Sequence, residues 1–255
     1  MPHAFPFVVA AAFGLVTGSF LNVCIYRLPR GRSIVWPASH CPSCGRALRW
    51  YENIPLVSYA ALRGACRTCR AAISPVYPVV ELATGVVFVV MYGQIGLGPL
   101  LAARLVFACA MIVLCVIDLR HRMLPNPITV GGILAGFAFS LGLPPGWLAS
   151  LVGVLAGGGS LLLIAEAYRL VRREEGLGMG DVKMLAMIGA FLGWKLMLLT
   201  LVLSSLLGAA VGLVMIAARK GDMKYALPFG TFLAVGALVA SIAGEAIIAW
   251  YMGFY

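Results

Sequence analysis

Charged residues are scarce in this chain of 255 residues: Asp, Glu, Lys and Arg make up 11% of it, and only nine residues are acidic. A soluble domain carries about 25% charged residues. Together with a hydrophobic share of 62%, this scarcity excludes an ordinary soluble domain and predicts an integral membrane protein. The first apolar run, 5–25, also lacks a basic segment before it and a small-residue cleavage site after it. We therefore expect a retained helix there rather than a signal peptide.

The apolar residues form eight runs, separated by charged or Gly- and Pro-rich breaks, that are long enough to cross a bilayer singly or in pairs. The sixth of these runs is short and rich in Gly and Met. The predicted fold class is an all-α integral membrane protein with about eight transmembrane helices. We place these helices at 5–25, 78–95, 99–117, 128–143, 147–168, 182–194, 196–217 and 227–250.

Basic residues set the expected orientation, because the cytoplasmic loops of membrane proteins are enriched in Lys and Arg. Of the 19 basic residues, 17 fall in four segments, which are 26–77, 118–127, 169–183 and 218–225. With eight crossings all four segments lie on one side, which is then the cytoplasm, and both termini lie outside. The net charge of +10 follows from this topology. It does not indicate a nucleic-acid partner, since it is spread over four loops without a recognition motif.

Four of the seven cysteines form two pairs in the cytoplasmic segment 26–77: Cys41 and Cys44 in C-P-S-C, and Cys66 and Cys69 in C-R-T-C. Two such pairs supply four thiolates that can converge tetrahedrally on one zinc ion. The alternative is disulfide bonding, which the reducing cytoplasm disfavours. Because four thiolates leave no open coordination position, we expect a structural zinc in this loop.

Two of the acids, Asp118 and Asp181, sit at the ends of apolar runs. Asp118 ends the third run, and Asp181 begins the sixth behind Gly178 and Gly180, in the pattern G-M-G-D. On the topology above both lie at the cytoplasmic membrane boundary, where two carboxylates can share a proton and activate a water against a peptide carbonyl. The glycines would let the backbone approach a substrate strand closely. Taken singly, each Asp is explained as well by a helix cap or by an ion pair with a basic neighbour, namely Arg120, Arg122 or Lys183.

A series of longer segments follows the same order as in a known family. They are GSFLNVCIYRLP at 18–29, the cysteine pairs around RWYENIPLVSYAALRG, YPVVELATG at 77–85, DLRHRMLPNPIT at 118–129, GMGDVKMLAMIGAFLGW at 178–194 and PFGTF at 228–232. In these segments the chain resembles the type IV prepilin peptidases, membrane aspartyl proteases of the GxGD type, over nearly its whole length. One small departure is Thr231, where the family commonly has Pro; we expect this difference not to touch the chemistry.

The resemblance implies that Asp118 and Asp181 are the catalytic aspartates and that the four paired cysteines bind zinc. Such enzymes are bacterial inner-membrane proteins that cut the basic leader from prepilins or pseudopilins, after a glycine, at the cytoplasmic face. Their substrates serve type IV pili and type II secretion. Bifunctional members also methylate the new N-terminus with S-adenosylmethionine. We therefore expect residues 1–95, with the zinc loop, to serve the methyltransferase and residues 96–255 to be the membrane-embedded peptidase.

The residues that would bind the methyl donor carry a weaker signal. The candidates are polar or small residues in apolar surroundings or in the loop, namely Gly18, Ser19, Asn22, Glu52, Asn53 and Glu81. Helix packing explains the first three as well, and loop folding explains Glu52 and Asn53. Glu81 stands out, because an acid inside an apolar run is costly unless it is paired or functional.

Two other classes of protein stay open on the residues alone. Boundary carboxylates and interrupted helices also suit a proton- or cation-coupled transporter with a structural zinc loop. Against this, the polar residues gather on one face and no internal repeat is evident. The third class is a membrane assembly protein stapled by zinc, in which the acids are structural. Cleavage of an added prepilin would separate the peptidase from both.

Overall fold

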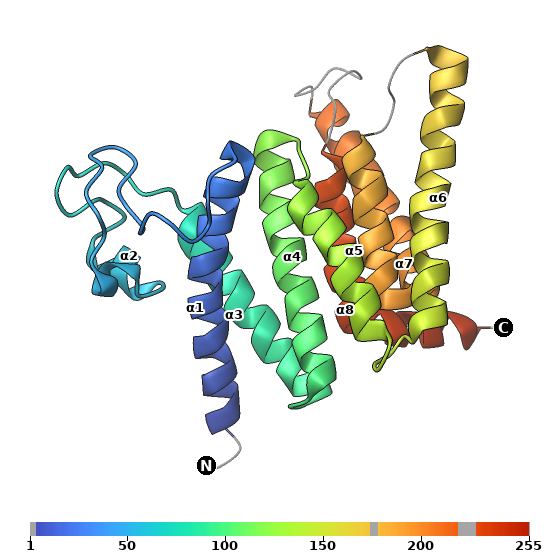
Figure 1. The fold of residues 1–255 in the computed structure, drawn as a ribbon, viewed down its shortest axis with the longest axis horizontal. Helices are drawn as coiled ribbons and strands as arrows, with labels where there is room; N and C mark the ends of the chain where they lie inside the picture. The colour runs from blue at the N-terminus through green and yellow to red at the C-terminus, as the bar shows by residue number, and fades with distance from the viewer. Residues whose placement is uncertain (1–3, 174–177, 219–227, 255) are drawn as a thin grey trace. The chain divides into compact units, whose positions relative to one another are not determined.

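The protein, described here by a computed structural model, is a helical chain with defined positions for residues 4–173, 178–218 and 228–254. Within these residues there is no strand beyond two isolated β-bridges. The predicted all-α class is therefore confirmed. The chain divides into two compact units, Met1–Leu101 and Ala102–Tyr255 (Figure 1).

Two long helices of the first unit, α1 (Phe5–Arg27) and α3 (Val76–Ile95), pack side by side (Figure 1). They run in opposite directions, since Gly14 of α1 faces Gly85 and Gly18, further along α1, faces the earlier residue Glu81. A Cβ added at Gly18 would lie 2.7 Å from the Cα of Glu81, and one at Gly14 would lie 2.8 Å from the Cα of Gly85. Small residues therefore let the two backbones approach closely, as apolar helices do in a bilayer.

The long connection between these two helices has little regular structure. Its helical pieces are short, namely η1 (Leu28–Arg30), η2 (Trp50–Asn53) and α2 (Val57–Ala61). Each cysteine pair forms a tight turn closed by an isolated bridge, as between His40 and Ala47. A segment of this length without a hydrophobic core of its own needs another source of order.

The second unit holds most of α4 (Pro99–His121) and all of α5 (Asn126–Ser140), α6 (Trp147–Arg172), α7 (Met179–Ala217) and α8 (Phe229–Met252). Its core centres on the first part of α7, where the side chains of Met184, Leu185, Met187 and Ile188 are fully buried. Helices α5, α6 and α8 all pack against α7. An apolar helix that is buried on every side is the central helix of its bundle.

Helix α7 is interrupted at Gly193, where φ is +75° and ψ is 173°. A left-handed φ of this kind favours glycine, because a Cβ would strain it. Before the break α7 runs antiparallel to α6: Leu185 lies against Gly157, and the later residue Gly189 lies against the earlier residue Gly153. Close contacts between glycines and backbone atoms hold these two helices together.

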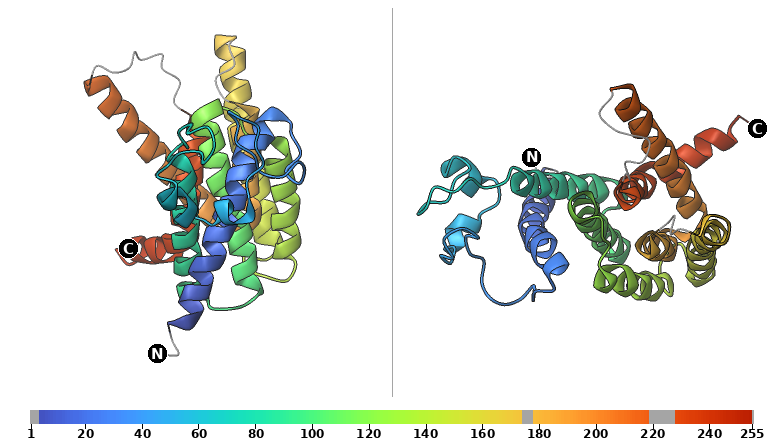
Figure 2. Two further views of the ribbon diagram at one scale, coloured as in Figure 1. Left: turned by 90° about the vertical axis from the view of Figure 1, so that its left-hand side faces the viewer. Right: turned by 90° about the horizontal axis from the view of Figure 1, so that it is seen from above.

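After the break α7 packs on α8 instead. Leu196 lies against Gly244, near the end of α8, and Ser204 lies against Gly236, nearer the start of α8. The later part of α7 therefore runs back toward the residues that begin α8. Figure 2 shows this later part, in dark orange, diverging from the first part of the same element.

The described residues contain six helices that are long and apolar enough to span a membrane, whereas the sequence predicted about eight. The expected span 128–143 corresponds to α5, which has 15 residues, fewer than the roughly 20 that a straight crossing needs. The expected spans 182–194 and 196–217 are the two parts of α7, which continue into one another at Gly193. Local sequence marks this break but does not show that helix resumes directly after it.

Candidate active site and cysteine cluster

Asp118 lies in the last turn of α4 and is only 5% exposed. Thr231, in the first turn of α8, bonds it twice: the backbone N–H donates to Oδ2 at 2.6 Å, and the hydroxyl donates to the same oxygen at 3.0 Å. The N–H of Thr231 is available because the first turn of a helix leaves its N–H groups without acceptors inside the helix. Two donors on one oxygen fix the orientation of the carboxylate and hold Oδ2 as an acceptor.

Asp181 lies in the first turn of α7 and is half-buried. Its backbone N–H donates to the carbonyl of Gly178 at 3.0 Å, and a Cβ added at Gly178 would lie 3.5 Å from its Oδ2. Asp181 and Asp118 also interact electrostatically, which supports placing the two carboxylates in one candidate site. Lys183, one of the basic neighbours considered for an ion pair, donates to the side-chain oxygen of Asn126 at 2.9 Å.

Leu124 brings the starts of α7 and α8 together beside this pair. A Cβ added at Gly180 would lie 3.0 Å from the Cβ of Leu124, and one added at Gly230 would lie 3.0 Å from its Cδ1. The same point beside Gly230 is 3.0 Å from Oδ2 of Asp118. Glycine is therefore favoured at both places, because a Cβ there would force Leu124 or the carboxylate to shift. The close approach of a substrate strand to Gly180 stays a prediction; in this structure the neighbour of Gly180 is Leu124.

This arrangement can perform the chemistry of a carboxylate pair. Two carboxyl groups on separate helices can share one proton, so that the ionised group takes a proton from water while the protonated group polarises a carbonyl. The simpler alternative keeps some support at Asp118, because the charge of Arg122 acts on its carboxylate. That interaction does not account for Asp181, whose carboxyl faces the same site from another helix.

The four cysteines meet at one point in the first unit. Their Sγ atoms all lie within 4.8 Å of one another, and those of Cys41 and Cys69 are 3.8 Å apart. A tetrahedron of thiolates with metal–sulfur bonds of about 2.3 Å has sulfur–sulfur edges of about 3.8 Å. A disulfide needs about 2.05 Å, and all four cysteines are free. The cluster therefore fits a metal ion held by four thiolates better than it fits disulfides.

Each cysteine pair is shaped by the same turn. The backbone carbonyl of Cys41 accepts a hydrogen bond from the N–H of Gly45 at 2.9 Å, and that of Cys66 accepts one from the N–H of Arg70 at 3.0 Å. Gly45 and Arg70 both have a positive φ, +69° and +59°. Backbone N–H groups point at the sulfur atoms in these turns: those of residues 69 and 68 lower the pKa of Cys66 to about 6. Turns that stabilise thiolates are suited to binding a cation.

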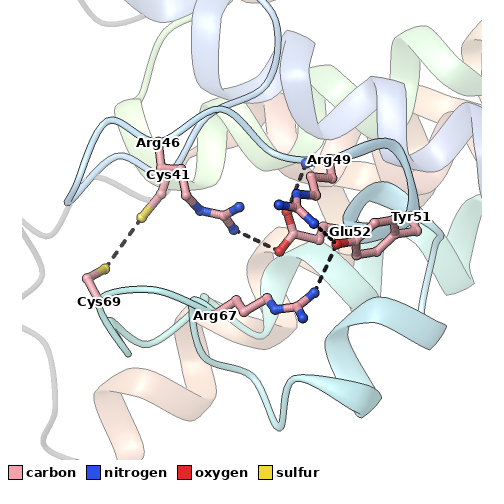
Figure 3. Close-up of polar contacts among 7 residues, drawn as sticks. All are labelled: Cys41, Arg46, Arg49, Tyr51, Glu52, Arg67 and Cys69. Atoms are coloured by element: carbon pink, nitrogen blue, oxygen red, sulfur yellow. Dashed lines mark hydrogen bonds and ion pairs between the residues drawn. The ribbon is translucent and has the colours of Figure 1, made fainter.

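Glu52 braces the connection between the two cysteine turns (Figure 3). Its carboxylate accepts from the Arg46 guanidinium at 2.7 Å and from the backbone N–H of Arg49 at 2.8 Å. The bond from Arg46 holds the pKa of Glu52 below its usual value. Arg49 and Arg67 in turn both donate to the Tyr51 hydroxyl at 2.9 Å. Since Arg46 follows the first cysteine pair and Arg67 lies within the second, these contacts tie the two turns together.

Several of the candidate residues for methyl-donor binding form hydrogen bonds within the first unit. The carboxylate of Glu81 accepts from the backbone N–H of Leu56 at 2.9 Å and takes a second hydrogen bond from Ser19. The Asn22 amide donates to the Tyr77 carbonyl at 3.0 Å. The structure thus brings Ser19 and Glu81 together between α1 and α3, with Asn22 one helical turn away from Ser19. Glu52 belongs to the brace just described, and Asn53 is exposed at the end of η2.

Two residues of the aspartate site escape sequence reasoning. The prediction that Thr231 does not affect the chemistry stays a prediction, but the residue was not expected at the site and both of its donors bond Asp118. The signal for this contact is its position at the start of an apolar run, where the N–H groups of a helix attract anions. Nothing in the local sequence points to Leu124, whose role depends on helices that meet only in the folded chain.

Two family models match the chain. The model described as "Bacterial Peptidase A24 N-terminal domain" matches residues 12–95, and the model described as "Type IV leader peptidase family" matches residues 105–213. The second match contains both Asp118 and Asp181, and the first contains all four clustered cysteines. The two matched regions fall in the two units of the structure.

Curated relatives cover almost the whole chain. A "Prepilin leader peptidase/N-methyltransferase" of Stutzerimonas stutzeri is 36% identical over 96% of this chain and 93% of the relative. A protein of the same name from Pseudomonas aeruginosa is 35% identical over 99% of this chain and 96% of the relative. Another from Myxococcus xanthus is 44% identical over 80% of this chain and 62% of the relative. No solved structure matches the chain.

Proposed function

The chain belongs to the type IV leader peptidase family, and on that premise we propose that Asp118 and Asp181 are its catalytic pair. It is a multi-pass membrane protein that cleaves leader peptides from prepilins and methylates the N-terminus that cleavage exposes, as its relatives are named for doing. A transporter has no support among these matches. The observation that carries the assignment of the pair is that two carboxylates, more than 60 residues apart in the chain, meet beside Leu124 at the starts of α7 and α8.

The two aspartates take different parts in the proposed reaction. Asp118 is the ionised partner, because the N–H and hydroxyl of Thr231 both donate to its Oδ2 and such donors stabilise a charged carboxylate. It takes a proton from a water molecule, which attacks the carbonyl carbon of the glycine that ends the leader. Asp181, protonated, donates a hydrogen bond to that carbonyl oxygen. The tetrahedral intermediate then collapses, the C–N bond breaks, and a proton passes to the leaving amine.

We further propose that the chain crosses the membrane eight times. The two parts of α7 each cross once, because the later part returns along α8 toward the residues beside Leu124. The shorter α5 crosses within a locally thinned bilayer or beside the longer helices. The basic segments then lie on the cytoplasmic side of the bacterial inner membrane, together with both aspartates, and both termini lie outside. Prepilin leaders, which are basic, would meet the site from that side.

For the four cysteines we propose a structural zinc ion. Cys41, Cys44, Cys66 and Cys69 would hold it, and its contribution is to order the long connection between α1 and α3, because four thiolates leave no position for a substrate. S-adenosylmethionine is the proposed methyl donor. It would supply an electrophilic methyl group, while residues 1–95, with Glu81, Ser19, Asn22 and Asn53 as candidates, would bind and orient it. Residues 96–255 would be the peptidase.

The experiment that tests the catalytic pair replaces one carboxylate at a time by an amide of nearly the same shape. Asp118→Asn and Asp181→Asn should each lower cleavage by at least roughly a thousandfold, because neither carboxyl group works alone. The purified variants are incubated with a prepilin, with and without S-adenosylmethionine, and the products are read by intact mass. Glu166→Asn is a suitable control, since Glu166 is exposed and, among the described residues, forms its ion pair with Arg169 at 2.8 Å. Substantial processing by either aspartate variant would remove that residue from the mechanism.

A further inference from the structure

Leu124 occupies the space directly beside the proposed catalytic pair. It follows α4 in the chain and lies over two glycines that begin α7 and α8. The Cβ position of an alanine at Gly180 is 3.0, 3.2 and 3.4 Å from the Cβ, Cδ1 and Cγ of Leu124. The Cβ position of an alanine at Gly230 is 3.0 Å from both Cδ1 of Leu124 and Oδ2 of Asp118. One apolar side chain thus fills the gap between two glycine backbones and a catalytic oxygen.

This crowding bears on the substrate, given the proposed function. For cleavage, the scissile carbonyl must lie within hydrogen-bond reach of both aspartates. The residue that carries this carbonyl is the last residue of the leader, and its Cα is bonded directly to the carbonyl carbon. Any Cβ on it therefore lies only one bond further from the reacting atom. On the side where Leu124 lies, a methyl group there would compete with the leucine for space.

The side chain of Leu124 cannot simply move aside. It is half-buried and packs against the hydrophobic core of the second unit, which includes buried residues of α7 such as Met184 and Leu185. The backbones of Gly180 and Gly230 lie at contact distance on its other sides. Protein interiors are close-packed, so that one added methylene forces side chains or backbone to shift. The space beside Asp118 is therefore fixed by packing.

We infer that Leu124 is a specificity-determining residue, which restricts the last residue of the leader to glycine by filling the space that a Cβ would need. The inference rests on the proposed function, because it places the scissile carbonyl between Asp118 and Asp181. It assigns the preference for glycine to a steric contact with one side chain. Charge and hydrogen bonding play no part in this selection, since neither a glycine nor an alanine side chain offers any polar group.

The expected magnitude follows from the size of one methyl group. An extra or missing methylene in an apolar pocket changes kcat/KM by about 10- to 200-fold. The unchanged enzyme should therefore prefer a prepilin with glycine before the cut over the same prepilin with alanine by at least about tenfold. Replacing Leu124 by alanine should raise kcat/KM for the prepilin with alanine before the cut and so remove most of this preference.

The experiment measures kcat/KM of the full-length enzyme on the two prepilins, which differ only in glycine or alanine before the cut. Leu124→Ala should reduce the glycine-to-alanine ratio by about tenfold, mainly by raising cleavage of the alanine substrate. Leu124→Met, which nearly conserves volume, should keep the ratio of the unchanged enzyme. Met123→Ala is the neighbouring control, because Met123 is 43% exposed and should also keep it.

A ratio is a suitable readout because it cancels any loss of folded protein in Leu124→Ala. An unchanged ratio in Leu124→Ala, with measurable cleavage of the glycine substrate, would overturn the inference and leave the catalytic pair intact. If Leu124→Ala proves too unstable to assay, Leu124→Val removes one methylene and must still lower the ratio for the inference to hold. Normal cleavage by Asp118→Asn would instead refute the proposed function, which is a separate outcome.

Discussion

Asp118 differs from Asp181 in the donors that reach it. Thr231 gives Asp118 two hydrogen bonds to one oxygen, from a backbone N–H and from a hydroxyl. A proline at the same place would supply neither donor, since proline has no N–H and no hydroxyl. The orientation of Asp118 in this chain therefore depends on the threonine at position 231.

Thr231→Val should lower kcat by about tenfold while leaving KM nearly unchanged, because it removes one hydrogen bond to a charged group without changing the volume of the side chain. Thr231→Ser keeps both donors and should restore kcat. Thr200→Val is the control, since Thr200 is buried and its hydroxyl donates to the carbonyl of Leu196 in its own helix at 2.8 Å. Steady-state kinetics on a prepilin would check this. Equal kcat in Thr231→Val and the unchanged enzyme would show that the hydroxyl is not needed.

Among the structural elements, the connection that carries the cysteines and helix α7 each depend on a few specific residues. The connection from Leu28 to Pro75 has only short helical pieces, and its order comes from the cysteine turns and from the Glu52 brace. In α7 the decisive feature is a single residue, Gly193, whose left-handed backbone lets an apolar helix reverse along a different neighbour. The conformation of both elements is set by these few residues rather than by the helix propensity of the surrounding sequence.

The purified protein should contain one zinc ion per chain. Changing any one of Cys41, Cys44, Cys66 or Cys69 to Ser should lower the zinc content and make the loop around 41–70 sensitive to proteases, because the binding energy of a structural zinc is folding energy. Cys24→Ser should keep the metal, since Cys24 lies in α1 and outside the cluster. Elemental analysis and limited proteolysis measure both effects. Four thiols that alkylate freely in native protein purified without chelators would contradict the zinc site.

At the scale of the whole molecule, the chain's two compact units separate the residues proposed for the two activities. The unit Met1–Leu101 contains the cysteine cluster and Glu81, and the unit Ala102–Tyr255 contains both aspartates. Methyl transfer requires a neutral amine aligned with a sulfonium, so that proximity and orientation carry most of the rate. The oxygens of the aspartate pair have no evident part in that step. The two reactions should therefore depend on different residues.

Glu81→Ala should lose methylation of a pre-cleaved pilin at least about tenfold more than it loses cleavage, and Asp181→Asn should show the reverse. The bond from Leu56 to Glu81 offers a competing explanation, in which Glu81 only braces the connection. Glu81→Gln distinguishes them, because its amide oxygen can still accept from the Leu56 N–H while the charge is lost. Each variant is assayed on cleaved and uncleaved substrate by intact mass. Parallel loss of both activities in Glu81→Ala and in Asp181→Asn would refute the division.

The sequence by itself determines the membrane class, the approximate positions of the helices and the identity of the cysteine set. These properties depend on local composition: an apolar run forms a helix whatever its neighbours are, and paired cysteines form the same turn wherever they stand. The candidate aspartates could also be selected from the sequence, because an acid at the end of an apolar run is rare and costly enough to stand out.

Only the tertiary structure decides what surrounds those aspartates. Thr231 is more than 100 residues from Asp118, yet it supplies both donors to that carboxylate, and Leu124 meets Gly180 and Gly230 from a third segment. Single-sequence patterns reach a few residues along the chain, whereas these contacts exist only because α7 reverses at Gly193 and brings the start of α8 beside the start of α7. The eight expected runs correspond to six long apolar helices for the same reason, since two of the runs continue into one another at Gly193 and a third is the shorter α5.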